Sequence, residues 1–293
     1  MLGAIIGDVV GSRWEGSGSK DPNFQWDTPY NVFTDDTLCT VSIARWLLDG
    51  GTGNTPVNDN PQQSIRDLCV DHARREFGGN MRMWLRSSNP TVQNSWGNGA
   101  VMRVSPVALW ATSDEEAKRL AAASVYPTHV HPQSIEGAQA ITWAIRHAFT
   151  HKDPQKLLSD ASDLLEYGDL TTRTLESERA KHTFDITTAG TAPLAIVCAC
   201  LSGGFEQSIR HAIAMGGDAD TLAAVAGSIA EGLYGIPQEC VNTLLNNPDF
   251  DHEPRLLDTL REFYSHPRVQ SFYKQNACNL PLLKVSHHVK IQL

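Results

Sequence analysis

Two short acidic clusters carry the side chains best suited to chemistry. The first is Phe33-Thr34-Asp35-Asp36-Thr37, and the second is Gly216-Gly217-Asp218-Ala219-Asp220-Thr221. Each comes directly before a run with helical character, Leu38 to Leu48 after the first and Leu222 to Tyr234 after the second. Aspartate and threonine oxygens are hard donors, which Mg²⁺ and Mn²⁺ prefer over histidine or cysteine. The clusters therefore form a candidate site for two divalent cations.

Helix capping is the simpler interpretation of either cluster. Asp and Thr are favoured N-cap residues because a side-chain oxygen accepts a hydrogen bond from an amide of the first turn. A cap needs one such oxygen, whereas each cluster offers two aspartates, adjacent in one and alternate in the other. The clusters lie far apart in the chain, and the sequence does not show that they meet. If they meet, their mutual repulsion requires bound cations.

The composition indicates an ordinary globular protein. Its 293 residues are 41% apolar and 19% charged, and 33 acidic against 24 basic residues give a net charge of -9. That balance argues against a broad phosphate-binding surface, so we do not expect nucleic acid as a partner. The six cysteines form no Cys-x-x-Cys pair, so we expect reduced, mostly buried thiols and no zinc.

The apolar segments favour a cytoplasmic protein without a membrane anchor. The longest, Ala189 to Leu201, is interrupted by Thr191 and Pro193 and is shorter than the ~20 residues that a membrane span needs. The N-terminal apolar run has no basic residues before it and contains Asp8, which is untypical of a signal peptide.

Helices are the elements that must position the acidic clusters. Ser113 and Glu116 have the spacing of a capping box, which predicts a helix to about Ala123, and Asp153-Pro154 is typical of another helix start. No alternation of strand and helix patterns is visible. We therefore predict an all-α fold, a compact single-domain bundle of about ten or more helices at the usual mean helix length. Residues 50–61 are expected to form a surface loop.

Five motifs in a fixed order closely resemble the ADP-ribosylglycohydrolase family, which includes the dinitrogenase-reductase-activating glycohydrolases and the ADP-ribosylhydrolases. Any single motif is weak, whereas the ordered set is specific. The resemblance covers residues 3–236, and residues 237–293 are expected to be a helical extension of the same domain, 1–293. The motifs are Gly7-Asp8-Val9-Val10-Gly11-Ser12-Arg13-Trp14-Glu15, Thr34-Asp35-Asp36-Thr37, Gly97-Asn98-Gly99-Ala100-Val101-Met102-Arg103, Thr128-His129 and Gly216-Gly217-Asp218-Ala219-Asp220-Thr221.

The resemblance implies a binuclear magnesium or manganese centre at the bottom of a cleft. Glu15, which closes the first motif, is implied to lie at the metals and to take part in catalysis, with Asp36 as the second candidate. The metal ligands carried over from the family are Thr34, Asp35, Asp36, Asp218, Asp220 and Thr221.

Substrate-binding residues are also implied by the resemblance. Gly97, Asn98 and Gly99 would approach the diphosphate or distal ribose, and His129 would contact the bound ADP-ribose. Trp96 stands where some relatives hold an aromatic ring against the nucleotide. Taken alone, the Gly-Asn-Gly sequence is better explained by a turn, and Trp96 is equally well explained by a place in the core.

Three further positions are open at this stage. Some relatives place a carboxylate just before the Gly-Asn-Gly loop, where this chain has 94–96, Asn-Ser-Trp, so the chain would need another base. His131 fits a structural role better than a catalytic one. Asp8 fits helix packing or capping better than a place beside the metals.

The function implied by the resemblance is hydrolysis at C1″ of ADP-ribose attached to a protein side chain, or of an ADP-ribose-containing small molecule. The transition state of such a reaction has oxocarbenium character, which surrounding carboxylates stabilise. The alternative is a non-catalytic protein of the same fold that binds ADP-ribose or neutralises an ADP-ribosyltransferase. The linkage, the choice between Mg²⁺ and Mn²⁺, and the oligomeric state are left open by the sequence.

Overall fold

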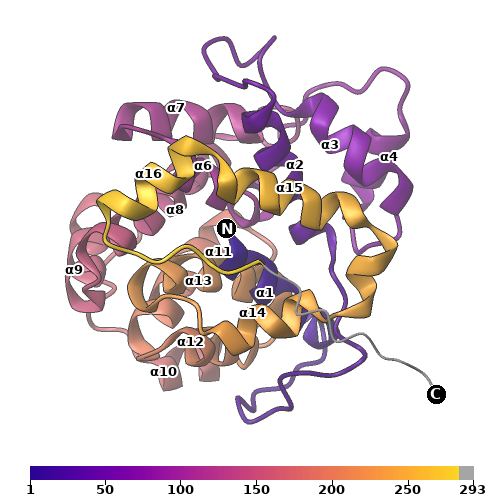
Figure 1. Ribbon diagram of the computed structural model, residues 1–293. Coiled ribbons are helices and arrows are strands. Elements are labelled where there is room, and N and C mark those ends of the chain that lie inside the picture. Colours follow the sequence, from indigo (N-terminus) through magenta and orange to yellow (C-terminus); the bar gives the residue numbers. More distant parts are fainter. Residues whose placement is uncertain (284–293) are drawn as a thin grey trace.

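Helices account for the regular structure of residues 1–283, the part of the chain that the computed structural model describes (Figure 1). Residues 284–293, the end of the predicted C-terminal extension, lie outside the described residues. The α-helices are α1 Leu2–Gly11, α2 Asp35–Leu48, α3 Gln62–Cys69, α4 Gly79–Arg86, α5 Gly99–Met102, α6 Ser105–Trp110, α7 Asp114–Val125, α8 Pro132–His151, α9 Pro154–Leu164, α10 Leu175–Lys181, α11 Thr188–Leu201, α12 Phe205–Ile213, α13 Ala219–Tyr234, α14 Gln238–Leu245, α15 Pro254–Ser265 and α16 Pro267–Gln275. The 3-10 helices are η1 Ser12–Trp14, η2 Val70–His72 and η3 Pro248–His252.

The prediction of an all-α single domain is confirmed. Residues 1–283 contain no β-strand, and their only β-type pairings are two isolated bridges, Asn94 with His129 and Gly97 with Thr187. None of the helices in this part of the chain has the length and apolar character required to cross a membrane. All six cysteines are free, and only Cys278 is partly exposed.

Helices α1 and α13 form the centre of the domain and touch through glycine. A Cβ atom on Gly7 would lie 2.2 Å from the backbone oxygen of Ala223, and one on Gly3 would lie 2.2 Å from that of Gly227. A Cβ atom on Gly11 would lie 2.6 Å from the Cα of Asp220. The two backbones can approach this closely only because these α1 positions lack a side chain. The contact brings the end of α1 to the start of α13, where Asp220 lies.

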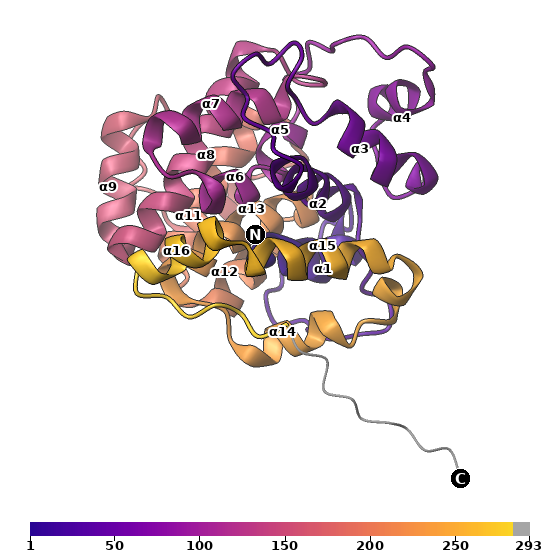
Figure 2. The same cartoon turned by 45° about the horizontal axis from the view of Figure 1, so that its top comes forward.

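A buried polar group ties the C-terminal helices to this pair. The Glu231 carboxylate of α13 accepts hydrogen bonds from the Met1 ammonium at 2.7 Å, the Gly3 amide at 2.9 Å, and the hydroxyls of Tyr264 and Tyr273 at 3.2 and 2.5 Å. In Figures 1 and 2, α15 and α16 run across the face where the N-terminus lies. The buried Glu231 carboxylate thus receives hydrogen bonds from α1, α15 and α16, the helices that pack around it, and buried charges need such partners.

The helices that carry the acidic clusters begin earlier than the sequence predicted. α2 starts at Asp35 rather than Leu38, because Thr34 is the N-cap and accepts from the Asp36 amide. α13 starts at Ala219 rather than Leu222, with Asp218 as its N-cap residue. The carboxylates therefore lie in first turns, where the helix dipole favours negative charge.

Other predicted helix starts fall where the sequence placed them. Ser113 accepts from the Glu116 amide, and α7 follows to Val125; Asp153 caps α9. The Glu116 carboxylate binds the amide of Thr112 instead of that of Ser113, so the capping box is shifted by one residue.

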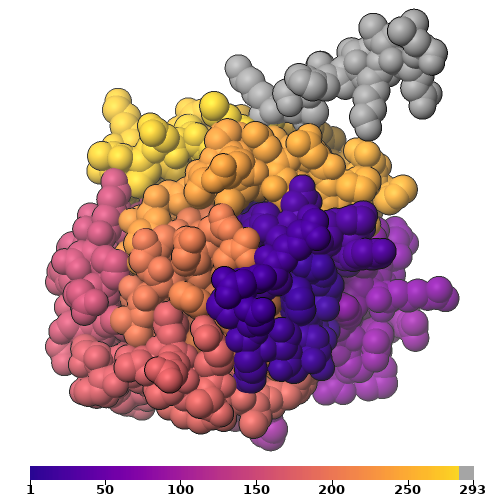
Figure 3. Space-filling view, turned by 90° about the horizontal axis from the view of Figure 1, so that it is seen from below, coloured from indigo at the N-terminus to yellow at the C-terminus, as the bar shows by residue number. Residues whose placement is uncertain are grey.

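The long connection between η1 and α2 packs on the loop before α13. The Gly16 amide donates to the Gly217 oxygen at 2.8 Å, and the Lys20 ammonium donates to the carbonyl oxygens of His182 and Met215. In Figure 3 the early residues, drawn indigo, form a continuous surface beside the orange region of the chain. Glu15, at the start of this connection, is held next to the second acidic cluster.

Candidate metal centre and active site

The two acidic clusters meet between the first turns of α2 and α13. The Thr221 hydroxyl donates to Asp36 Oδ2 at 2.9 Å, a hydrogen bond between residues 185 apart in the chain. One carboxylate oxygen of Asp36, one of Asp220 and one of Asp8 lie within 4.8 Å of one another. Asp36 and Asp220 are both buried, at 2% and 3% exposure. The convergence on which the metal hypothesis depends is therefore present in the structure.

Asp8, on α1, holds the first acidic cluster in place through hydrogen bonds. Its carboxylate accepts hydrogen bonds from the amide and hydroxyl of Thr34 and from the amide and hydroxyl of Thr37. These four donors occupy most of its lone pairs, so Asp8 is better placed to orient the start of α2 than to ligate an ion. The sequence interpretation of Asp8 as a capping residue agrees with this arrangement.

The centre contains buried oxygens that lack a partner. Within the described residues, Asp36 Oδ1 and Asp220 Oδ1 are inaccessible to solvent and accept no hydrogen bond. Burial, and then the charges of neighbouring aspartates, raise the pKa of both carboxyls well above its usual range. Unpaired buried carboxylates are costly unless a cation binds them. The donor set fits hard divalent cations, which oxygen ligands select.

Two exposed carboxylates stand at the outer side of the same centre. Oxygens of Glu15, Glu76 and Asp220 lie within 4.8 Å of one another. Burial, followed by the charge of Asp218, raises the pKa of Glu15. Burial, followed by the charge of Glu15, raises the pKa of Glu76 to about 7. Asp220 therefore belongs to two groups of carboxylates, an inner group with Asp8 and Asp36 and an outer group with Glu15 and Glu76.

A cleft of about 500 Å³ opens over these residues. Buried aspartates form its floor, the Gly97-Asn98-Gly99 segment and His129 form one wall, and apolar side chains also belong to its lining. This volume falls within the range of small-molecule sites. The lining residues are Glu15, Asp35, Asp36, Glu76, Gly78, Gly79, Asn80, Met81, Gln93, Ser95, Gly97, Asn98, Gly99, Met102, Arg103, His129, Phe184, Ile186, Asp218, Asp220 and Thr221.

Asn98 connects the Gly-Asn-Gly loop to the acidic floor. Its side-chain amide donates to Asp218 Oδ2 at 2.7 Å and to Thr191 Oγ1 at 3.2 Å. Gly99 is needed for close approach rather than for a turn, because a Cβ there would lie 2.9 Å from the His129 ring. The loop therefore orients an aspartate and leaves room beside His129.

His129 lines the cleft as a buried, neutral imidazole. The guanidinium of Arg103, itself 1% exposed, donates to Thr128 Oγ1 at 3.1 Å, and Thr128 Oγ1 lies 2.7 Å from His129 Nδ1. A Thr128 hydroxyl that donates to Nδ1 places the ring proton on Nε2. Burial, and then the charge of Arg103, lower the pKa of His129 well below its usual value.

Two predicted site residues do not line the cleft. Trp96 is 61% exposed and meets His131 edge to face at 5.8 Å, so the interpretation as a core tryptophan is wrong. Thr34 is buried, donates its hydroxyl to Asp8 and accepts from the Asp36 amide, so its oxygen is already engaged in hydrogen bonds. Their roles as nucleotide contact and metal ligand stay predictions. His131 caps α8 by accepting from the Gln133 amide, a structural role as expected.

Among the Asp, Glu, Lys and Arg residues that line the cleft, Glu76 and Arg103 are the two that sequence reasoning did not single out for a role. Arg103 ends the Gly-Asn-Gly motif, and a basic residue there was a signal for a buried counter-charge. Glu76 belongs to no motif, and no periodic pattern marks it. Its place at the cleft comes from the backbone of the segment between η2 and α4.

The fold of this chain occurs in a solved structure. A structure titled ADP-ribosylglycohydrolase-related protein complex superposes with a TM-score of 0.62, at 23% identity over 89% of this chain and 95% of that one. The chain is thus an all-helical domain of the ADP-ribosylglycohydrolase fold.

The chain belongs to the ADP-ribosylglycohydrolase family, whose model matches residues 1–269. The match continues beyond residue 236, where the sequence motifs ended, and includes α14 and α15. The zebrafish (Danio rerio) ADP-ribosylhydrolase ARH3 is 22% identical, covering 92% of this chain and 90% of its own length. The ADP-ribosyl-[dinitrogen reductase] glycohydrolase of Rhodospirillum rubrum is 24% identical, covering 80% and 84%.

Proposed function

We propose that this protein is a hydrolase that cleaves the glycosidic bond at C1″ of ADP-ribose attached to a protein side chain. The observation that carries the proposal is the meeting of Asp36 and Asp220, each with an unpartnered buried oxygen among the described residues, at the floor of a cleft. The names of the relatives in zebrafish and R. rubrum describe removal of ADP-ribose, which agrees with this assignment.

Divalent cations, two Mg²⁺ or Mn²⁺, complete the proposed centre. Such ions, when bound, supply a template for sugar hydroxyls and Lewis-acid polarisation. The residues that would hold them are oxygen donors from both clusters, with Asn98 orienting one carboxylate from outside. The cation ligands proposed at the cleft are Asp35, Asp36, Asp218, Asp220 and Thr221.

Glu15 is the proposed base that activates the attacking water. It lies at the solvent side of the centre, where water has access, and it is more exposed than the aspartates of the floor. Asp36 is less suited, because it is buried and its Oδ2 accepts from Thr221. The acidic floor stabilises the positive charge that develops on the sugar.

The opposite wall of the cleft is the proposed binding surface for the rest of ADP-ribose. Gly97 and Gly99 have no side chain to fill the space beside the His129 ring, and a proton on Nε2 would make that ring a donor there. A neutral donor suits hydroxyl and phosphate oxygens without drawing charge away from the centre.

Release of ADP-ribose tests the proposal directly. Arginine-linked, serine-linked and O-acetyl ADP-ribose substrates are incubated with the protein in Mg²⁺, Mn²⁺ or EDTA, and free ADP-ribose is measured by chromatography. We expect turnover of at least one substrate in a cation, loss of turnover in EDTA, and no turnover by Asp220→Asn. Asp258→Asn, which changes an exposed carboxylate of α15, is the matched control. ADP-ribose binding without turnover of any substrate would favour the non-catalytic alternative.

A further inference from the structure

Glu76 occupies an unusual position in the connection between η2 and α4. Its φ of 63° lies in the left-handed region, which a residue with a side chain adopts at a cost. The side chain is solvent-exposed and lines the acidic cleft. Nothing in the sequence around it marks a site.

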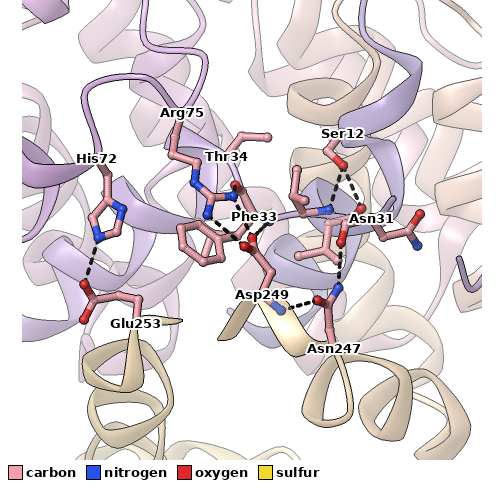
Figure 4. A network of polar contacts seen from close by, with 12 residues as sticks. Ser12, Asn31, Phe33, Thr34, His72, Arg75, Asn247, Asp249 and Glu253 are labelled. Atoms are coloured by element: carbon pink, nitrogen blue, oxygen red, sulfur yellow. Dashed lines mark hydrogen bonds and ion pairs between the residues drawn. The ribbon is translucent and has the colours of Figure 1, made fainter. Parts of the chain in front are cut away.

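Both neighbours of Glu76 are fixed in place. The Arg75 guanidinium donates to both oxygens of Asp249, at 2.7 and 2.8 Å, and to the Phe33 oxygen at 3.2 Å, as Figure 4 shows. On the other side, Phe77 is 1% exposed in the core. A residue between two such anchors cannot relax its backbone by moving either of them. The Glu76 side chain is therefore held toward the cleft.

Three separate segments bring carboxylates together at this point. Glu15 comes from the connection after η1, Glu76 from that before α4, and Asp220 from the first turn of α13. One oxygen of each lies within 4.8 Å of the other two. Among the described residues, no lysine, arginine or histidine forms a salt bridge with any of the three.

A missing positive charge is indicated independently by Asp220. Its side chain is 3% exposed, it lines the cleft, and its Oδ1 accepts no hydrogen bond from any residue that the structure describes. Asp220 also belongs to the inner group with Asp36. A carboxylate shared by two groups has the arrangement of a bridging ligand.

We propose that Glu76 is a cation ligand that, with Glu15 and Asp220, holds a divalent metal ion on the solvent side of the centre. The inference rests on the proposed cation centre and adds to it a residue outside the family motifs. Oxygen donors from three segments leave the solvent side of the ion to water, as Mg²⁺ and Mn²⁺ sites commonly do. Glu15 has two carboxylate oxygens, so one can face the ion and the other the attacking water.

Manganese binding to the full chain tests this role without relying on activity. Free Mn²⁺ is followed by electron paramagnetic resonance as it is added to the wild type, to Glu76→Gln and to Asp71→Asn. Asp71 is an exposed carboxylate of η2, so its variant removes the same charge from nearby in the chain. We expect Glu76→Gln to raise the dissociation constant of the weaker Mn²⁺ ion at least ~10-fold, as for loss of about 1.4 kcal/mol. Asp71→Asn should bind like the wild type.

A second variant separates a ligand from a structural residue. Glu76→Gly removes the carboxylate and also the cost of the left-handed backbone. It should bind Mn²⁺ as weakly as Glu76→Gln, yet its melting temperature in EDTA should rise by about 2 °C. Lowered stability of both variants in EDTA would assign Glu76 to the fold and overturn the proposal.

The remaining outcomes separate this inference from the proposed function. If Glu76→Gln and Glu76→Gly bind Mn²⁺ like the wild type while the wild type releases ADP-ribose, the ligand role of Glu76 is wrong and the proposed function stands. If the wild type itself binds no Mn²⁺ or Mg²⁺, both are wrong.

Discussion

Arg75 and Asp249 form a two-pronged ion pair, with Nη1 2.7 Å from Oδ2 and Nη2 2.8 Å from Oδ1. The same Oδ2 accepts from the Phe33 amide at 3.0 Å, and the Arg75 guanidinium lies 4.1 Å from the Phe33 ring centroid (Figure 4). Phe33 directly precedes the first acidic cluster, and Arg75 directly precedes Glu76. One carboxylate of η3 therefore positions two segments of the cleft, although the C-terminal part of the sequence shows no motif.

Replacing Asp249 with Ala should lower both stability and cation affinity. The Asp249 side chain is 12% and that of Arg75 26% exposed, so the loss of Asp249 leaves a partly buried guanidinium without its carboxylate and the Phe33 amide without its acceptor. We expect a loss of about 2–4 kcal/mol in the free energy of unfolding, measured by urea denaturation in EDTA. Asp49→Ala is the control, because Asp49 pairs with Arg45 at 58% exposure and should cost less than ~1 kcal/mol. Equal losses in the two variants would contradict the positioning role of Asp249.

The stabilisation of the protein by Mn²⁺ should increase with pH. In the cation-free protein the pKa of Glu76 is raised from 4.5 to about 7, and that of Glu15 is also raised. Between pH 4.5 and about 7 the folded state therefore binds more protons than the unfolded state. The free energy of unfolding falls as pH rises through this range. A bound cation replaces those protons and removes the loss.

Thermal unfolding at pH 5.5 and pH 7.5, with excess Mn²⁺ and with EDTA, checks this expectation. His129 acts in the opposite direction, because its lowered pKa favours the folded state as pH rises toward 6.5. The difference between the Mn²⁺ and EDTA curves cancels that contribution. A shift in melting temperature that is the same at both pH values would show that these carboxyls do not hold the ion.

Thr128→Val should weaken ADP-ribose binding by changing the protonation of His129. Valine keeps the shape of threonine but cannot donate to Nδ1, so the ring proton is no longer confined to Nε2. We expect the dissociation constant for ADP-ribose to rise about tenfold, as for loss of one hydrogen bond. Histidine ¹⁵N resonances report the tautomer independently of binding. Thr128→Ser, which retains the hydroxyl, should behave like the wild type, and a fixed Nε2–H form in Thr128→Val would contradict this account.

Gly7→Ala should destabilise the protein by forcing α1 and α13 apart. The added Cβ meets the Ala223 oxygen at 2.2 Å, and rigid backbone cannot move aside as a side chain would. We expect a loss of about 1–3 kcal/mol in the free energy of unfolding. Gly79→Ala, where a Cβ meets nothing within 4 Å, should change stability by less than ~0.5 kcal/mol. Similar stabilities for the two variants would show that α1 can shift without cost.

Local signals in the sequence predicted much of this architecture. Caps at Ser113 and Asp153 fixed helix starts because they act within one turn. The two acidic clusters were recognisable as excess carboxylate at helix N-termini, since capping requires only one oxygen. Gly3, Gly7 and Gly11 lie four residues apart on one helical face, a spacing that permits the close approach of another helix, but no prediction was drawn from it.

Glu76 and Asp249 were beyond reach of such signals. Glu76 is an ordinary glutamate in a loop, and its direction depends on a positive φ that no neighbouring residue type requires. Asp249 acts through partners at Phe33 and Arg75, more than 170 residues away in the chain. Their contribution arises from tertiary contacts, which no local pattern encodes. The predicted starts of α2 and α13 were three residues too late for a local reason. The aspartates of both clusters were placed before the helices, whereas Asp35, Asp36 and Asp220 lie in the first turns.

The packing of α1 has a consequence for how this chain is made. Every residue of α1 is buried, and its partner on α13 is distant, with Gly3 and Glu231 separated by 228 positions. A ribosome releases α1 long before α13, so this apolar helix lacks its partner during the synthesis of the residues between them, when exposed apolar surface promotes aggregation. The nascent chain should therefore depend on a chaperone at its N-terminal end, and slow translation should increase that dependence.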